Sequence, residues 1–222
     1  SEAPEITPEP TPEPVGSFRN KFADKFTDGE VIKTDNTYQS ANLNITFQRK
    51  YFDELMSRVY YADIYIADIS CLRTVLAEDT FGKGYKEWIT KVARRTGSVV
   101  TMNGDYYGSR DFGVVARNGT LYRDAKNIRD VAVLYWDGHM KKRYPRSAFG
   151  YYEPGHYCFV VVDGRLAESK GVKLDGLSRV MEGLGCAVAY NLDGGQTSLL
   201  AREDKLINRP SGRGRRASDF II

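Results

Sequence analysis

The sequence has few residues of the kinds that build histidine-based or zinc-based active sites. Only two histidines, His139 and His156, occur, and neither stands near a serine or cysteine in a recognisable nucleophile setting. A histidine triad and a multi-histidine metal site are therefore disfavoured. The three cysteines, Cys71, Cys158 and Cys186, are odd in number and widely spaced, which favours free buried thiols over a zinc site. Oxygen ligands would have to hold any divalent cation, and the sequence does not identify such a metal.

Long apolar runs and a strong charge of one sign are also missing. Apolar runs such as Cys158–Val162 are far too short to cross a bilayer, so no transmembrane segment is expected. No signal peptide is present in the sequence as given, as expected of a mature or a trimmed chain. The 32 basic and 29 acidic residues give a net charge of only +3, which argues against nucleic acid as a partner. Any anion must therefore bind at a local basic cluster.

Proline is scarce except near the N-terminus, where residues 1–17 hold five of the eight prolines and repeat Thr-Pro-Glu-Pro. Such a segment favours extended polyproline II structure and cannot bury apolar area, so residues 1–17 are predicted to be a linker. An acidic, proline-rich linker indicates an N-terminal tether and an extracellular or cell-surface location. Residues 18–222 are long enough for a substantial core and are expected to form a single domain.

The remaining chain has the periodicity of strands, helices and hairpins. Strand patterns cover residues 40–47, 58–69, 98–102, 157–162, 186–192, 199–207 and 218–222, and the first two runs are expected to pair. Apolar residues at helical spacing predict helices over residues 18–28, 85–95 and 174–184. Asn118-Gly119 and Asp137-Gly138 stand between β-prone runs as ordinary hairpin turns.

The helix predicted over 174–184 lies between two predicted strands, 157–162 and 186–192. A strand–helix–strand unit of this length predicts a right-handed crossover that joins parallel strands. We therefore expect an α+β fold, with a mixed β-sheet that combines antiparallel hairpins and at least one parallel strand–helix–strand crossover. The helix before Ser98 predicts a third strand of the same direction.

Polar residues directly follow the two crossover strands, as Asp163-Gly164-Arg165 and as Asn191-Leu192-Asp193-Gly194-Gly195. Because parallel strands end at the same edge of a sheet, these two segments are expected side by side, where open sheets commonly bind ligands. Asn103 and Asp105 would reach the same edge from the strand of residues 98–102. An ordinary hairpin turn at Asp193-Gly194 is the alternative interpretation.

A glycine-rich loop, residues 208–216, carries four arginines. It is enclosed between β-prone segments and contains no aromatic residue, which disfavours nucleic-acid binding. Guanidinium groups on a constrained loop suit a phosphate or a carboxylate.

These segments together resemble the phosphodiester glycosidase family, in its bacterial type. The matching features, in the family's order, are Asn103–Tyr107, Pro145–Gly150, Asp163–Arg165, the crossover helix, Asn191–Gly195 and Asn208–Pro210. The resemblance covers residues 40–222. It implies a hydrolase that cleaves the bond between the anomeric carbon of a sugar and a phosphodiester oxygen. The expected substrate is a carbohydrate with a glycosyl-1-phosphodiester, in a surface or extracellular glycan.

A phosphate leaving group is a weak base, so such an enzyme depends less on a general acid than on arginines and on a carboxylate facing the oxocarbenium-like carbon. We expect Asp193 to be that carboxylate, with Asp163 as the second candidate. The residues expected to bind phosphate or sugar, or to line the pocket, are Arg146, Arg165, Asn103, Asp105, Asn191, Gly194, Gly195, Ser198, Arg209 and Arg216. Alternatively, Arg165 pairs with Asp193 only to hold the two loops together.

The chain departs from the family pattern at three places. Gln196-Thr197-Ser198 replaces a third glycine and the serines that follow it. Asp105 and Tyr106 stand where many members have glycine and phenylalanine, and many relatives have several dozen more residues between Gly138 and Arg146. Two other functions stay open: hydrolysis of other glycosidic bonds in cell-wall or capsular polysaccharide, and non-catalytic binding of anionic glycans at a surface.

Overall fold

The computed structural model describes residues 16–125 and 143–222, and its strands form two sheets and a separate hairpin. The seven-stranded sheet has the spatial order β1 (Ile32–Lys33), β2 (Thr37–Gln39), β3 (Leu43–Phe52), β4 (Ser57–Ile66), β10 (His156–Val162), β9 (Arg146–Glu153), β11 (Val188–Asn191). The five-stranded sheet has the order β13 (Lys205–Leu206), β12 (Leu200–Arg202), β6 (Val100–Asn103), β14 (Asp219–Ile221), β5 (Thr74–Leu76). The hairpin consists of β7 (Gly113–Arg117) and β8 (Thr120–Ala125).

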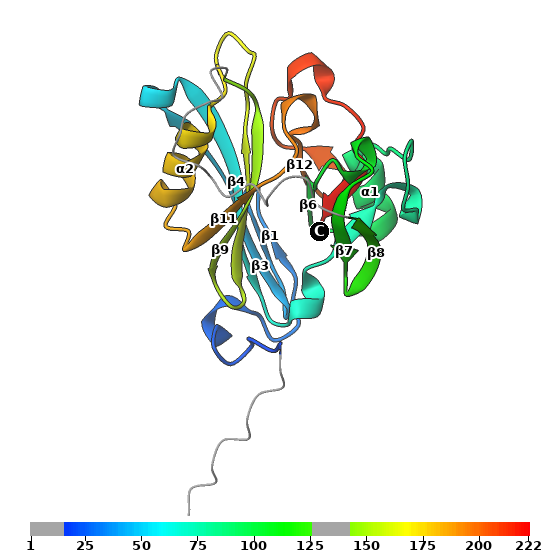
Figure 1. Ribbon diagram of the computed structural model, residues 1–222. Coiled ribbons are helices and arrows are strands. Elements are labelled where there is room, and N and C mark those ends of the chain that lie inside the picture. The colour runs from blue at the N-terminus through cyan, green and yellow to red at the C-terminus, as the bar shows by residue number, and fades with distance from the viewer. Residues whose placement is uncertain (1–15, 126–142) are drawn as a thin grey trace, which may run out of the picture.

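The described residues contain two α-helices, α1 (Ile89–Thr96) and α2 (Leu174–Gly183), which cover the outer faces of the two sheets. Short 3-10 turns occur at Ala23–Lys25, Asp53–Leu55, Ile69–Cys71, Ala77–Asp79, Tyr107–Ser109, Gly195–Thr197 (η6) and Ser211–Arg213 (η7). Leu177 and Val180 of α2 belong to one core cluster with strands of the large sheet, and Ile89 of α1 belongs to another with strands of the small sheet. The layers are therefore α2, large sheet, small sheet and α1 (Figure 1).

The apolar run of strand β10 is continuous because both faces of the strand are buried. Successive side chains of a strand point to opposite faces, and both faces of this strand are covered. Phe159 and Val161 belong to the core between the two sheets, whereas Val160 and Val162 pack with α2. All four side chains are fully buried. The burial of this strand fixes where it ends, and the polar residues Asp163–Arg165 follow at that point.

The predicted α+β fold with a parallel crossover is wrong. Every ladder between the described strands is antiparallel, and strands dominate over the two α-helices. Strand β9 inserts between β10 and β11 and pairs antiparallel with both, so the helical connection through α2 does not join neighbouring strands. The pattern of residues 174–184 predicts the helix correctly, but the sequence analysis did not predict β9, which directly precedes β10, pairs with it across the turn at Pro154-Gly155 and occupies the place beside it.

The predicted third strand of the crossover sheet is also wrong. Residues 100–103 form β6, which belongs to the other sheet and pairs antiparallel with β12 and β14. The helix predicted over 18–28 is reduced to the 3-10 turn of Ala23–Lys25, because this segment is tied to the chain beside β4 by the bond from Phe18 N–H to the carbonyl of Ala67. Tertiary contacts here override the helical spacing of the phenylalanines.

Several local predictions are confirmed. Strands β3 and β4 pair along their whole length, β12 and β13 form the hairpin predicted over 199–207, and α1 ends at Gly97 with a left-handed φ of 66°. Asn118 and Gly119 both have positive φ, as a two-residue hairpin turn requires. The turn predicted at Asp137-Gly138 lies outside the described residues. The three cysteines are free: Cys158 is buried, and Cys71 and Cys186 are half-buried.

Candidate functional site

Polar segments lie together at one edge of the large sheet, where β10 and β11 end and β9 begins. Strand β10 ends at Val162, opposite Arg146, where β9 begins, and Asn191 at the end of β11 stands opposite Ala148. Since β10 and β11 flank β9 and are both antiparallel to it, they end at the same edge. The segments Asp163–Arg165 and Asp193–Gly195 therefore lie on either side of the chain that enters β9.

Backbone contacts hold these segments closely together. The N–H of Gly195 donates to the carbonyl of Pro145 over 3.0 Å. A Cβ atom on Gly194 would stand 2.9 Å from that carbonyl oxygen, and one on Gly164 would stand 2.7 Å from the nitrogen of Pro145. Only glycine fits at these two positions without displacing the chain. The two glycines therefore allow three backbone segments, those at Pro145, Gly164 and Gly194, to lie close together at the site.

Asn103 connects the small sheet to the same edge. Its side-chain Nδ2 donates to the carbonyl of Asp193 over 2.9 Å, and its Oδ1 accepts bonds from the hydroxyl of Ser147 and the N–H of Leu199. The side chain is fully buried. The structure therefore brings Asn103 to the predicted site. It does so by packing the small sheet on the large sheet, and not through a third parallel strand. The side-chain amide of Asn103 fixes the position of the Asp193 backbone.

Asp193 presents a half-buried carboxylate held by its own loop. Its Oδ1 accepts the N–H of Gly194 over 2.8 Å, and its Oδ2 lies 2.7 Å from the hydroxyl of Thr197 in η6. Burial raises the pKa of Asp193 above its ordinary value, against the opposing effects of these two hydrogen bonds and of the charge of Arg215. The sequence analysis missed Thr197 in this role, although its spacing of four residues from Asp193 is typical of such a turn.

Two arginines lie beside this loop without a carboxylate partner among the described residues. Arg146 is 6% exposed, and its one hydrogen bond is a long one, 3.4 Å from Nε to the carbonyl of Val172. One of its terminal nitrogens is buried and has no hydrogen-bond partner. Arg165 is exposed, and its two terminal nitrogens stand 3.8 Å from the position of a Cβ atom built on Gly195. Both guanidinium groups lie within 6 Å of the Tyr144 ring centre, at 5.7 and 5.1 Å.

No ion pair joins Arg165 to Asp193 within the described parts of the chain, so the proposed structural pairing of these two residues is not present. Burial lowers the pKa of Arg146 from its usual value, but a guanidinium with so high a pKa stays charged. The edge thus holds a buried cation whose charge the described protein residues do not neutralise.

Asp163, the second predicted carboxylate, faces the loop of residues 208–216. Its Oδ1 accepts the side-chain amide of Asn208 over 2.8 Å, and its Oδ2 accepts the N–H of Arg209 over 3.1 Å. Asp163 is 1% exposed, and burial raises its pKa to about 6 against the opposing effect of those hydrogen bonds. The Arg209 side chain turns away to an exposed ion pair with Glu168. Both oxygens of Asp163 are thus occupied in fixing this loop.

Three further polar atoms at the edge are buried and have no hydrogen-bond partner among the residues that the structure describes. They are Oδ1 of Asn191, Oγ of Ser198 and Oγ of Ser211. Asn191 and Ser198 are predicted site residues, whereas Ser211 has no signal in the sequence beyond its place in the arginine-rich loop. Buried hydroxyl and amide groups of folded proteins normally have partners, so these atoms are available to a ligand.

Asp105 and Arg216 stand at the margins of the site. The N–H of Asp105 donates to the carboxylate of Asp219, and its own carboxylate lies 3.4 Å from Arg110. Its negative charge contributes to raising the pKa of Asp193. Arg216 is exposed and contacts no partner among the described residues. Its neighbour Arg215, which the sequence analysis did not select, acts electrostatically on Asp193. Two adjacent arginines look alike in a sequence, and only the fold separates them.

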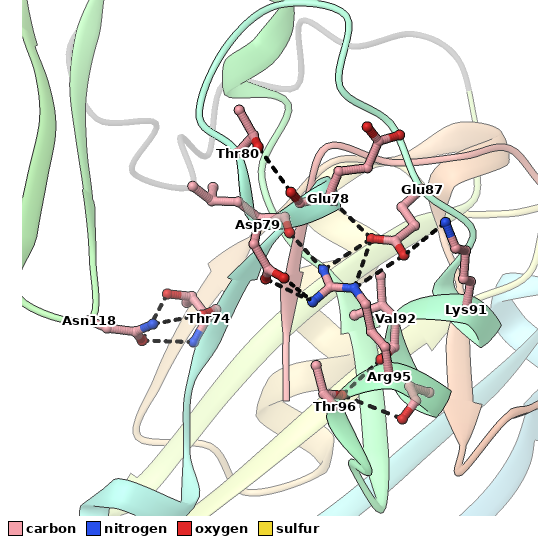
Figure 2. Close-up of polar contacts among 12 residues, drawn as sticks. Thr74, Glu78, Asp79, Thr80, Glu87, Lys91, Val92, Arg95, Thr96 and Asn118 are labelled. Atoms are coloured by element: carbon pink, nitrogen blue, oxygen red, sulfur yellow. Dashed lines mark hydrogen bonds and ion pairs between the residues drawn. The ribbon is translucent and has the colours of Figure 1, made fainter.

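A second charged cluster, beside α1, has the opposite character (Figure 2). Arg95 donates to both carboxylate oxygens of Glu87 and to both of Asp79, and it also donates to the carbonyl of Leu76. The N–H of Glu78 completes the shell around the Glu87 carboxylate. The guanidinium of Arg95 and the carboxylates of Glu87 and Asp79 are thus all paired, and they tie α1 to the chain that follows β5.

The described residues contain no group of three or more histidine, cysteine, aspartate or glutamate side chains arranged to hold a metal ion. No helix in the described part of the chain is long and apolar enough to cross a membrane.

The comparisons with known proteins agree with this architecture. The family model of the phosphodiester glycosidases matches residues 108–222, which is more than half of the chain. This span includes Arg146, Asp163 and Asp193. The chain belongs to the phosphodiester glycosidase family, and its family and fold point to a hydrolase of that type.

Two solved structures share the fold. The catalytic domain of zebrafish N-acetylglucosamine-1-phosphodiester alpha-N-acetylglucosaminidase, auto-inhibited by its pro-peptide, aligns with a TM-score of 0.59 at 16% identity over 89% of this chain and 84% of that one. A hypothetical protein from Synechocystis aligns with a TM-score of 0.57 at 13% identity, over 86% of this chain and 63% of that one. Likenesses at such low identity establish the fold alone.

A curated relative is the SPbeta prophage-derived uncharacterized protein YomE of Bacillus subtilis (strain 168). It is 25% identical over 182 residues, which cover 59% of this chain and 28% of that protein. The chain thus spans less than a third of the length of this relative.

Proposed function

We propose that this domain hydrolyses a glycosyl-1-phosphodiester of an extracellular or surface glycan. The observation that carries the proposal is Arg146, a buried guanidinium that lacks a carboxylate partner among the described residues and lies at the same edge as the Asp193 carboxylate. A buried charge without a counter-charge costs folding free energy, and a bound phosphate would supply that counter-charge through bidentate hydrogen bonds.

In this proposal, the scissile phosphate lies between Arg146 and the exposed Arg165. Both guanidinium groups are placed around Tyr144, which restricts where they point. Negative charge grows on the leaving phosphate as the glycosidic bond breaks, and fixed guanidinium groups stabilise that charge more in the transition state than in the ground state. A protonated acid at the leaving oxygen is unnecessary, because a phosphomonoester dianion or monoanion is a stable leaving group.

Asp193 acts on the sugar side of the bond that is cleaved. Its carboxylate stabilises the positive charge that develops at the anomeric carbon and accepts a proton from the attacking water. The water oxygen forms a bond to the anomeric carbon, and the electron pair of the old carbon–oxygen bond goes to the phosphate. The raised pKa of Asp193 suits proton acceptance, because it makes the carboxylate a stronger base than an exposed aspartate. The unpartnered atoms of Asn191 and Ser198 then hydrogen-bond the sugar hydroxyls.

Asp163 is a positioning residue in this scheme. Its two carboxylate oxygens accept hydrogen bonds from the Asn208 side chain and from the N–H of Arg209, so neither oxygen is directed to a substrate. The two remaining alternatives are hydrolysis of neutral glycosidic bonds and glycan binding without turnover. A neutral glycoside leaves the buried Arg146 without a counter-charge, whereas an anionic glycan bound without turnover would supply one, so the effect of Asp193→Asn on turnover and on binding distinguishes the binding module from the enzyme.

The test is a panel of α- and β-glycosyl-1-phosphodiesters and matching neutral glycosides, assayed with and without a chelator. Wild-type protein should release sugar only from the phosphodiesters. Asp193→Asn should stay folded and lose activity by about three orders of magnitude or more, within the range seen when a reacting carboxylate or nucleophile is neutralised. Asp175→Asn is the matched control, since Asp175 lies exposed on α2.

Two results would overturn the proposal. Equal release of sugar from neutral glycosides would remove the phosphate assignment. Tight binding of a phosphodiester by the folded wild-type protein without turnover, unchanged in Asp193→Asn, would identify a binding module.

A further inference from the structure

The loop of residues 208–216 is fixed against the site by its first two residues. The Asn208 amide donates to Asp163 over 2.8 Å and to the carbonyl of Ser198 over 3.1 Å, and its oxygen accepts the N–H of Leu200. Asn208 is 5% exposed. The loop therefore has a defined place beside η6, and the side chains that follow Asn208 are held near the segment that carries Asp193.

The middle of the loop contacts η6 directly. A Cβ atom built on Gly212 would stand 2.3 Å from the side-chain nitrogen of Gln196, so the two turns η6 and η7 touch there. Ser198 follows η6 and Ser211 begins η7, and both hydroxyls are buried without a hydrogen-bond partner among the described residues. Ser198 is assigned to the sugar in the proposed reaction, so the hydroxyl of Ser211 in the neighbouring turn indicates a further ligand-binding position next to that sugar.

The charge of the loop points to the ligand. Residues 206–217 contain four arginines and no aspartate or glutamate. Of these arginines only Arg209 forms an ion pair, whereas Arg213, Arg215 and Arg216 are exposed and pair with no described carboxylate. Five arginines elsewhere have an acidic partner, namely Arg94, Arg95, Arg110, Arg117 and Arg179. Others, namely Arg73, Arg123, Arg143 and Arg202, donate to backbone carbonyls.

We propose that η7 and the arginines after it form a second anion subsite, which binds the next phosphate of the same substrate. The substrate is then a chain of repeating glycosyl phosphates, not a small molecule with a single phosphodiester. This inference rests on the proposed function and adds the class of substrate to it. Arg146 and Arg165 hold the phosphate that is cleaved, and Arg213, with Arg215 and Arg216 after it, holds the phosphate one repeat away.

The test compares a glycosyl-1-phosphodiester that has one phosphate with an oligomer of three glycosyl-phosphate units of the same sugar. Wild-type kcat/KM should be at least about tenfold higher for the oligomer, as one additional charge-assisted contact provides. Arg213→Gln should remove most of that preference and leave turnover of the single phosphodiester within about twofold. The preference should also shrink as salt rises, because exposed charges are screened. Arg179→Gln on α2 is the matched control and should keep the preference.

The outcomes separate the two proposals. Equal kcat/KM for both substrates overturns the second subsite and leaves the proposed function intact. No turnover of either substrate by folded protein overturns the proposed function. The subsite is then judged by calorimetric binding of the same two compounds, where equal Kd values overturn it and a tighter oligomer Kd that Arg213→Gln abolishes supports it. An oligouronate of equal charge that competes as well as the phosphate oligomer overturns the assignment to phosphate.

Discussion

Arg95 and Arg146 are arginines in opposite situations within the same fold. Arg95 beside α1 has the carboxylates of Glu87 and Asp79 and a backbone carbonyl around its guanidinium (Figure 2). Arg146 at the start of β9 is more deeply buried, yet it has one long hydrogen bond and no described acidic partner. The described residues pair the charges of the cluster beside α1 and supply no counter-charge for the more deeply buried Arg146, which fits the anion proposed to bind there.

The pKa directions of the two regions follow the same division. Burial alone would raise the pKa of Glu87, but the hydrogen bonds and charge of Arg95 bring it below its ordinary value. Burial dominates at Asp193 and Asp163, whose pKa values are raised. The charges beside α1 therefore stabilise the fold, whereas those at the edge of the large sheet cost folding free energy.

Among the changes that test this comparison between the two regions, the largest effect is expected from Arg146→Met. This substitution removes a buried charge that has no protein counter-charge, so the free energy of unfolding should stay the same or rise. Loss of a charge-stabilising donor should lower kcat/KM on a glycosyl-1-phosphodiester by about 100-fold to 1,000-fold. Chemical denaturation and steady-state kinetics on the same preparation measure both quantities. A variant that unfolds easily but keeps its activity would reverse the assignment of Arg146.

The next largest effect is the converse one, in Arg95→Met. This change leaves the carboxylate of Glu87, 2% exposed, with only the ammonium group of Lys91 at 3.7 Å, and the free energy of unfolding should fall by about 3 kcal/mol. The activity of the fraction that remains folded should be unchanged. Arg179→Met is the matched control, because Arg179 and Asp175 are exposed and their pair is worth about 0.5 kcal/mol or less. An equal loss of stability in both variants would contradict the difference drawn between the clusters.

Local features of the fold are predictable from the sequence where a local cause decides them. The length of α2 follows from Leu177, Val180 and Met181 at helical spacing, and the β7–β8 turn follows from Asn118-Gly119. Sheet order is only partly local. Strand β9, which separates β10 from β11, directly precedes β10 and pairs with it across the turn at Pro154-Gly155, a turn signal that the sequence analysis did not use. Its pairing with β11 on the other side is not local.

The candidate site is predictable to the level of segments. Both predicted polar segments reach one edge because β10 and β11 run in the same direction, although an intervening strand enforces this and not a parallel pair. The direction in which each side chain points is not predictable. Asp163 follows the buried strand β10 and Asp193 follows the partly exposed strand β11, and Asp163 bonds to Asn208, which lies 45 positions away in the chain.

Asp163 is an intermediate case, a buried carboxylate with neutral partners only, and it predicts a pH dependence. Its folded pKa of about 6 lies above the ordinary 3.8, so the native state keeps a proton that the unfolded state has lost. Its contribution to the free energy of unfolding is fully present below about pH 4 and is lost as pH rises through about 6, a total of about 3 kcal/mol.

Urea denaturation of wild type and Asp163→Asn between these pH values isolates this group, because the variant cannot titrate there. The free energy of unfolding of wild type minus that of the variant should fall as pH rises, and then stay level. A difference independent of pH would mean that Asn208 and the N–H of Arg209 keep Asp163 ionised throughout. In that event Asp163 would belong with the fully paired charges beside α1.

Thr197→Val is expected to have the smallest effect. It distinguishes most directly between a catalytic role and a structural role of Asp193. The hydroxyl of Thr197 lies 2.7 Å from Asp193 and lowers its pKa, and valine keeps the shape of the side chain without that hydrogen bond. The pKa of Asp193 should rise further, and the acid limb of the kcat/KM profile should move up by about one pH unit, which costs about tenfold in activity on that limb.

Above that limb the Thr197→Val variant should match wild type, because Asp193 is ionised in both. Thr96→Val is the matched control, since the Thr96 hydroxyl bonds only to carbonyls of α1. A uniform loss of activity at all pH values would show that Thr197 only shapes the loop. A shift confined to the acid limb requires that the ionised form of Asp193 takes part in the reaction, because a carboxylate that only held the loop in place would leave the pH profile where it was.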